Sequence, residues 1–228
     1  MKQFLNNYFP FLFLIIVAIV LYANATEHYL LDLIFKPLIV ISLLVYLFIM
    51  NGIKRKAVVF AISGLILSSS GDVLLLFQKQ NALFFMGGLI SFLLAHVAYI
   101  FYYVRSSDVI AAKKLNAKLI FVLMLVLFGT VFYSILYNGL GGLKIPVFVY
   151  TVVLIGMNVS ALNRYGKVNS KSFDLIMLGA ICFLLSDSLL AFNKFYMPLP
   201  FGGILIMGTY AAAQYFIVKG VIANGDAV

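Results

Sequence analysis

The chain has 228 residues, of which 64% are hydrophobic and only 10% are charged, against roughly 45–50% apolar and 25% charged residues in soluble domains. With a mean hydropathy of +1.12, this composition excludes an ordinary soluble domain and indicates an integral membrane protein. The net charge of +9 would suit nucleic acid, but the basic residues stand in short segments between apolar runs, as in the cytoplasmic loops of membrane proteins. Nucleic acid is therefore not expected as a partner.

Apolar runs long enough to cross a bilayer recur along the whole chain. The first run could also be a cleaved signal peptide, but its removal would leave the repeat described below incomplete, so we favour a retained helix. The sequence predicts an all-α polytopic membrane protein of eight transmembrane helices. The runs span residues 8–22, 31–50, 57–77, 83–103, 117–136, 145–162, 173–192 and 201–222.

The distribution of basic residues predicts the orientation of these helices. With the N-terminus inside, twelve of the 16 Lys and Arg residues fall on the cytoplasmic side, which places both termini in the cytoplasm. Short loops and the lack of a retention signal favour a bacterial inner membrane over the endoplasmic reticulum. The twelve are Lys2, Lys54, Arg55, Lys56, Arg105, Lys113, Lys114, Lys118, Arg164, Lys167, Lys171 and Lys219.

The chain also resembles itself when it is shifted by 115 positions. The shift superimposes Asp72 on Asp187 and Lys79 on Lys194, although the chain has only seven acidic residues. Two parallel four-helix repeats, at about residues 1–106 and 113–228, would therefore form one transmembrane domain with a pseudo-twofold axis along the membrane normal. Between residues 64 and 88 the shift gives nine identities: at Gly64, Ile66, Asp72, Leu74, Leu75, Phe77, Lys79, Gly87 and Gly88.

The repeated aspartates are the strongest candidates for function. An Asp at the centre of a spanning helix costs roughly 2.5–3.5 kcal/mol, so a chain that retains one generally uses it. Asp72 and Asp187 each lie about five residues before the outer end of the predicted helix, roughly 7–8 Å deep. Two acids at equal depth could face each other and hold one proton between them. The alternative is a structural polar pair, hydrogen-bonded to neighbouring Ser or Tyr groups.

Three lysines are candidates to bind a phosphate group at the outer surface. Lys79 and Lys194 lie seven residues beyond each aspartate, on the same helix face and roughly 10 Å nearer the surface. Lys36 stands at the outer start of the second helix. The alternative is that these side chains simply extend to the membrane interface, as lysines at helix ends commonly do.

Four further polar residues are candidates to line a substrate site. By its position in the fourth helix, His96 should lie two or more turns deeper than the aspartates and act only through its neighbours. Tyr150, Tyr210 and Gln214 stand in apolar surroundings and could equally serve as hydrogen bonds between helices. With two histidines in the chain, a three-histidine zinc site is excluded. We expect neither a metal nor an organic cofactor.

Several of these residues stand in short motifs. The motifs are Lys36-Pro37-Leu38, Ser69-Ser70-Gly71-Asp72, Phe92-x-x-Ala95-His96-x-x-Tyr99, Ser186-Asp187-x-x-Leu190-Ala191-x-x-Lys194-Phe195 and Tyr210-x-x-Ala213-Gln214. Together they resemble the YhhN-like lysoplasmalogenase family. The resemblance implies eight spans and hydrolysis of the vinyl ether bond of lysoplasmalogens, with lysoplasmenyl-ethanolamine or -choline as the lipid substrate. It also implies that Asp72 and Asp187 are the active-site pair.

Two intramembrane carboxyl groups suit the chemistry that the resemblance implies. An acid protonates the enol ether to an oxocarbenium ion, a nearby carboxylate stabilises that cation, and water captures it, as in glycosidases. The residues do not assign the acid to one aspartate, because a coupled pair titrates as a unit. A proton-coupled carrier of lipids or small solutes, without bond cleavage, and a structural membrane protein are the alternatives.

Overall fold

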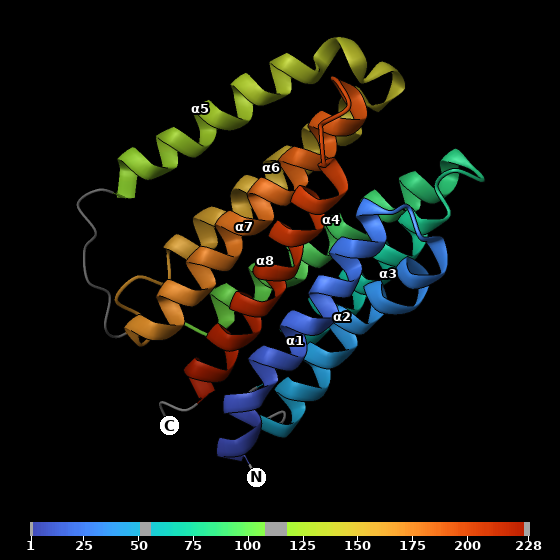
Figure 1. The fold of residues 1–228 in the computed structure, drawn as a ribbon. Helices are drawn as coiled ribbons and strands as arrows, with labels where there is room; N and C mark the ends of the chain where they lie inside the picture. Colours follow the sequence, from blue (N-terminus) through green and yellow to red (C-terminus); the bar gives the residue numbers. More distant parts are fainter. Residues whose placement is uncertain (1, 51–55, 108–117, 226–228) are drawn as a thin grey trace.

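The structure, a computed structural model, describes residues 2–50, 56–107 and 118–225. Four of the basic residues used to predict the orientation, Lys54, Arg55, Lys113 and Lys114, lie outside these residues. Within the described part, the chain forms eight long α-helices and two single-turn 3-10 helices between α5 and α6 (Figure 1). The long helices are α1 (Lys2–Ala25), α2 (Tyr29–Met50), α3 (Val58–Leu76), α4 (Ala82–Arg105), α5 (Lys118–Leu136), α6 (Lys144–Leu162), α7 (Ser170–Phe195) and α8 (Gly202–Gly225).

All eight predicted spans are confirmed as helices of sufficient length and hydropathy to cross a membrane. The difference that affects the site lies in α7, which continues to Phe195 and not to the predicted end at residue 192. Asp187 therefore lies eight residues before the end of its helix, about 12 Å below it at 1.5 Å per residue. Asp72 lies four residues before the end of α3 at Leu76, about 6 Å below it.

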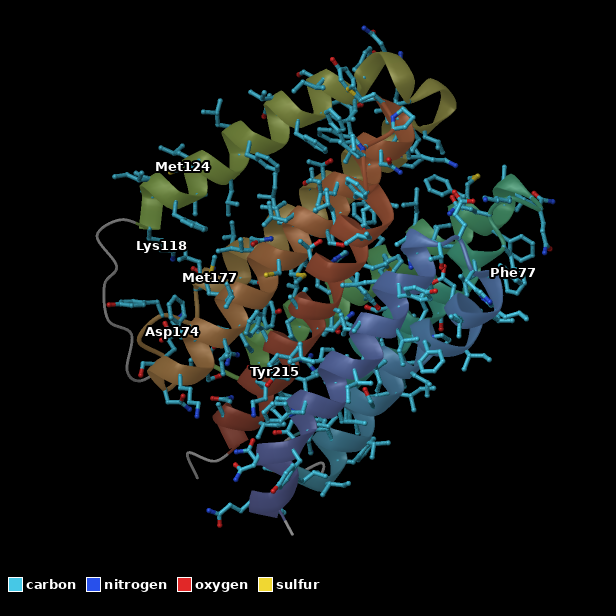
Figure 2. The ribbon with its side chains drawn as sticks, viewed as in Figure 1. Phe77, Lys118, Met124, Asp174, Met177 and Tyr215 are labelled. Carbon is cyan, nitrogen blue, oxygen red and sulfur yellow. The ribbon has the colours of Figure 1, made fainter. Side chains whose placement is uncertain are left out.

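Both termini lie at one end of the bundle, as an even number of helices requires (Figure 1). We call this the terminal end and the opposite one the Lys194 end. Figure 2 shows Asp174 of α7 near the terminal end and Phe77, just after α3, at the Lys194 end. The orientation of these ends in a membrane stays a prediction.

The helix contacts come in pairs related by the 115-residue shift. α3 packs on α4 as α7 packs on α8, and α4 packs on α6 as α8 packs on α2. A glycine allows close approach in each of the first two contacts. A Cβ atom on Gly64 would come within 2.7 Å of the Tyr99 ring, and one on Gly179 within 3.0 Å of the Ala213 carbonyl oxygen. These paired contacts favour the predicted two-repeat organisation.

The first helix of each half breaks this pairing. α1 packs along α2 and α8, whereas α5 packs along α6 and touches α7. Figure 1 shows α5 standing apart from the other helices. Much of α5 is exposed as a result, including Met124 at 63% (Figure 2).

One basic residue counted among the cytoplasmic loops is buried in the structure. Arg164, just after α6, is 0% exposed and donates hydrogen bonds to the hydroxyls of Ser106 and Ser172. It therefore ties α6 to the ends of α4 and α7 and does not reach the surface. Charge counting missed this contact because it treats every loop residue as solvated.

Candidate functional site

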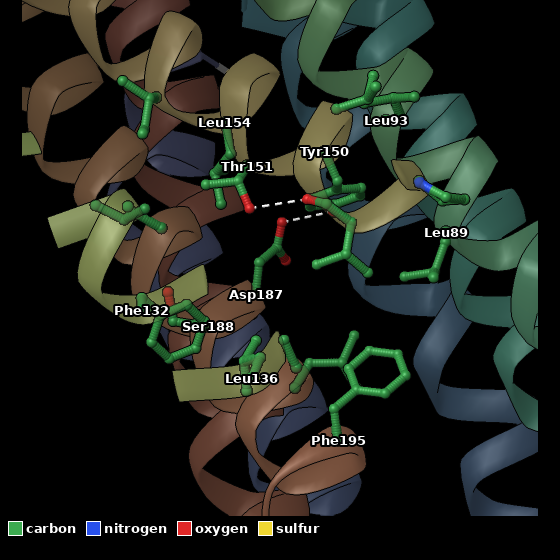
Figure 3. A pocket seen from close by; sticks show the side chains of 18 of the residues that line it. Leu89, Leu93, Phe132, Leu136, Tyr150, Thr151, Leu154, Asp187, Ser188 and Phe195 are labelled. Atoms are coloured by element: carbon green, nitrogen blue, oxygen red, sulfur yellow. Dashed lines mark hydrogen bonds between the residues drawn. The ribbon is translucent and has the colours of Figure 1, made fainter. Parts of the chain in front are cut away.

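A cavity of about 260 Å³ lies between α4, α5, α6 and α7 (Figure 3). Its walls are almost entirely apolar, and its polar groups come from α6 and α7. α6 contributes Tyr150 and Thr151, and α7 contributes Asp187 and Ser188. Because the Thr151 hydroxyl donates to the Val147 carbonyl oxygen in its own helix at 2.8 Å, the carboxyl group is the main reactive group on the wall.

The Asp187 carboxyl lies beside residues of two other helices, one of which makes a hydrogen bond to it. The Tyr150 hydroxyl of α6 donates a hydrogen bond of 2.6 Å to its Oδ2 atom, and Nε2 of His96, from α4, lies 3.3 Å from the same oxygen. Asp187 itself is 8% exposed. Oδ2 is thus the carboxyl oxygen that accepts the Tyr150 hydrogen bond, and Asp187 is one of the residues that line the cavity.

The predicted depth of His96 is wrong. The structure places its ring directly beside Asp187, packed edge-on against the rings of Tyr150 and Phe183 at centroid distances of 5.5 and 4.8 Å. The prediction counted residues from the expected helix ends. Because α7 extends three residues further, Asp187 lies about 4.5 Å deeper than predicted, which accounts for part of the difference. Counting residues cannot give the rest, because the contact also depends on how α4 and α7 are placed relative to each other.

Asp72 has different surroundings, although it is buried to a similar extent, with 5% exposure. It is absent from the residues that line the cavity. Its polar neighbour is the Tyr210 hydroxyl of α8, and the charges of Lys36 and Asp187 also reach it. The contact with Tyr210 falls short of a well-formed hydrogen bond, because Oδ2 of Asp72 and the Tyr210 hydroxyl have no such partner in the described structure.

The two acids share one interior, in which the charge of Asp187 reaches Asp72. Each also has its own tyrosine neighbour, Tyr150 for Asp187 and Tyr210 for Asp72. That the two carboxyl groups share one proton stays a prediction. The aromatic ring of Phe183 lies between the two environments, edge-on to both His96 and Tyr210. Among the described residues, no three His, Cys, Asp or Glu side chains are grouped to hold a metal ion.

Gln214 lies between the halves and not on the cavity wall. The Tyr99 hydroxyl donates a hydrogen bond of 2.7 Å to its Oε1 atom, and the two residues are 115 positions apart. Both side chains are fully buried. This bridge joins equivalent positions on α4 and α8, so it lies at the predicted pseudo-twofold axis. Sequence reasoning selected Gln214 but not Tyr99, although the 115-residue shift superimposes them.

Of the three predicted phosphate-binding lysines, Lys194 lies beside the cavity. Its Nζ atom lies 4.6 Å from the centre of the Phe85 ring, and Phe85 lines the cavity. Its Nζ also lies 3.4 Å from Oε1 of Gln78, which brings the ends of α3 and α7 together. The exposed Lys194 ammonium is thus at the outer margin of the cavity.

The other two predicted lysines lie away from the cavity. Lys36 pairs with Asp32, one helical turn earlier, at 3.4 Å, and Lys79 is exposed in the turn after α3. Lys144, which the sequence did not single out, begins α6 one residue before cavity-lining Ile145. Its Nζ atom lies 4.0 Å from the centre of the Tyr137 ring.

Comparisons with known proteins point to one family. The sequence model of the YhhN family matches residues 31–221. The chain is 28% identical over 169 residues to "Lysoplasmalogenase TMEM86A" of Bos taurus and 30% identical over the same length to that of Homo sapiens. Each alignment covers 72% of this chain and 66% of the relative, so the chain spans just under two thirds of their length. "Lysoplasmalogenase TMEM86B" of Homo sapiens is 29% identical over 67% of this chain and 59% of its own. No solved structure matches the chain.

Proposed function

The chain belongs to the YhhN family, and we propose that it hydrolyses the vinyl ether bond of lysoplasmalogens to a fatty aldehyde and a glycerophospho-alcohol. The names of its relatives supply the activity. The observation that carries the proposal is the single carboxyl group on the wall of an apolar cavity between membrane-spanning helices. Lysoplasmenyl-ethanolamine and lysoplasmenyl-choline are the proposed substrates.

The cavity suits a lipid with one polar end. Its apolar walls would receive the hydrocarbon chain, while Lys194 at its outer margin would hold the phosphate group. Asp187 lies about 12 Å below the end of α7 at Phe195, so the vinyl ether would lie between these two regions. Apolar walls with a few fixed polar groups are typical of ligand sites.

Asp187 is the proposed acid. Its carboxyl proton passes to the alkene carbon that is not bonded to oxygen, and the electron pair of the double bond forms the new C–H bond. The resulting oxocarbenium ion is stabilised by the Asp187 carboxylate. A water molecule then attacks the cationic carbon and returns a proton to Asp187. The hemiacetal collapses to aldehyde and alcohol, so one water molecule is consumed and the acid is regenerated.

Tyr150 and His96 would position this acid. The hydrogen bond from Tyr150 occupies Oδ2, so Oδ1 is left to carry the proton toward the substrate. Asp72 would act at longer range, because its negative charge in the same low-dielectric interior favours a cationic intermediate. General acid catalysis of this kind contributes about 10²–10⁴ to a rate.

The test is aldehyde release by the purified protein in lipid vesicles. Lysoplasmenyl-ethanolamine should yield fatty aldehyde, whereas the 1-alkyl analogue, which lacks the double bond, should yield none. An Asp187→Asn protein that keeps its thermal unfolding midpoint should lose the release. If wild-type protein moves the lipid across the vesicle without aldehyde, it is a carrier, and the proposed reaction is wrong. If the Asp187→Asn protein releases aldehyde at the wild-type rate, Asp187 is not the acid.

A further inference from the structure

The cavity opens sideways toward the lipid-facing surface. Several of its lining residues are exposed, among them Ile145 and Val149 of α6 at 77% and 43%. The exposed lining residues of the α4 and α5 walls are Ile90 of α4 at 55% and Phe128 of α5 at 39%. Ile90 lies eight residues after the start of α4 at Ala82, and Phe128 eight residues before the end of α5 at Leu136. Both are thus about 12 Å below the Lys194 end. The opening therefore lies at the depth of Asp187, where the surroundings are hydrocarbon.

The corresponding place in the first half is closed. There α1 packs on α8, with the Phe13 and Tyr215 rings stacked at 5.2 Å and Leu21 within 4.0 Å of the position of a Cβ atom on Gly208. α5 does not pack along α4 in this way. It contacts α6 through Gly129, where a Cβ atom would lie 2.3 Å from Cδ1 of Ile155. The opening thus results from the different placement of equivalent helices.

We propose that the gap between α4 and α5 is the entry through which a single-chain lipid passes its hydrocarbon chain from the bilayer into the cavity. Ile90 and Phe128 form the two sides of this entry. The cavity volume of about 260 Å³ lies below the roughly 300–1,000 Å³ of common ligand pockets, which suits one chain and not two. The proposal rests on the proposed function for the identity of the substrate, but lipid entry can be measured without the reaction.

The chain contains no tryptophan, so one introduced Trp reports on its own surroundings. Phe85→Trp and Leu89→Trp place it on the α4 wall of the cavity. Ile15→Trp is the matched control, because Ile15 is 58% exposed on α1 and lies ten residues before the end of that helix at Ala25. Each protein, in vesicles, receives either a lysophosphatidylethanolamine with a dibrominated acyl chain or a dibrominated diacyl phosphatidylcholine. Bromine quenches Trp fluorescence only at short range.

We expect the lysolipid to quench Phe85→Trp and Leu89→Trp several-fold more than Ile15→Trp, and to do so saturably. The diacyl lipid should quench Ile15→Trp more than the cavity positions. Equal quenching of all three proteins by the lysolipid would overturn the proposal, as would strong quenching of the cavity positions by the diacyl lipid. The two cavity variants are independent, so misfolding of one leaves the other informative.

Closing the gap tests the route. In a Phe85→Trp, Cys182→Ser protein, Ile90→Cys and Phe128→Cys are joined by a bifunctional maleimide, and each single cysteine variant carries a monofunctional maleimide as control. The cross-link should abolish the saturable quenching, which the controls should retain. Persistent quenching after cross-linking would show another route and refute the entry. Because the brominated probe has no vinyl ether, quenching without aldehyde release from a plasmenyl lipid would leave the entry standing and refute the proposed reaction alone.

Discussion

Asp72 and Asp187 lie 115 positions apart, at matching places in the two predicted repeats, but of the two only Asp187 lines the cavity between α4, α5, α6 and α7. Asp187 accepts a hydrogen bond from Tyr150 and lies beside His96, while Asp72 has Tyr210 as its polar neighbour within a packed interior. The acids themselves do not cause this difference. It follows from the first helix of each half, since α1 packs against α8 and α5 leaves α4 uncovered.

The comparison suggests how a duplicated bundle acquires one site from two similar halves. The half in which all four helices pack closely supplies rigidity and a second negative charge. The half in which one helix stands apart supplies space for a ligand. The following substitutions therefore compare residues around the two acids. The acids, glycines and lysines are pairs 115 positions apart, and the tyrosines are the polar neighbours of the two acids.

The largest difference should come from the acids. Asp187→Asn removes the proposed proton donor, so aldehyde release should fall by about 10²–10⁴. Asp72→Asn removes only a charge at longer range, and release should fall about tenfold, equivalent to roughly 1.4 kcal/mol. Initial rates with lysoplasmenyl-ethanolamine measure both, and Asp174→Asn, at an exposed position near the start of α7, is the control. Equal losses in both variants would mean that the acids act as one unit.

The tyrosines should show the same asymmetry on a smaller scale. Tyr150→Phe removes a hydrogen bond to a carboxylate, an interaction of about 1.5–3 kcal/mol, and should lower kcat by roughly 10–100-fold. Tyr210→Phe should change kcat only a few-fold, because Tyr210 does not line the cavity. A merely structural role of Tyr150 would lower the unfolding midpoint and leave kcat per folded molecule unchanged, so both quantities are measured on each variant.

The glycines compare the packing of the two halves. A Cβ atom on Gly179 would lie 3.0 Å from two backbone atoms of α8, the Ala213 oxygen and the Ile217 nitrogen, whereas one on Gly64 would meet the ring of Tyr99. A ring can rotate more easily than a helix can move. Gly179→Ala should therefore cost more stability than Gly64→Ala, within the roughly 1–3 kcal/mol typical of overpacking. Unfolding in detergent measures both, and the reverse order would contradict the packing argument.

The sequence predicts the helices well because their cause is local. Each span is a run of apolar residues, and the hydropathy of a run does not depend on its neighbours. The aspartates were also predictable, since a charge in an apolar run is conspicuous and its repetition at 115 positions is more so. Tyr99 could have been found in the same way, by taking the partner of Gln214 at that shift.

The contacts between helices were not predictable because they depend on tilt and length. His96 and Asp187 meet partly because α7 is longer than its apolar run suggests and partly through the placement of α4 and α7 relative to each other. Hydropathy does not show that α5 stands apart from the bundle while α1 packs against it, since α1 and α5 are similarly apolar. For the same reason, the sequence did not indicate which acid would face a cavity.

The smallest difference should come from the lysines at the Lys194 end. Lys194→Gln removes a cation that lies 4.6 Å from the centre of the cavity-lining Phe85 ring, so KM should rise about two- to fivefold, as for a single exposed charge contact. Lys79→Gln, the equivalent change in the first half, should leave KM unchanged, because Lys79 lies away from the cavity. Salt weakens interactions between exposed charges, so the difference between the two variants should shrink when KM is measured at high ionic strength. An equal rise in KM in both variants would indicate that Lys79 and Lys194 hold the phosphate together. The two lysines would then not differ in function as the two acids are expected to.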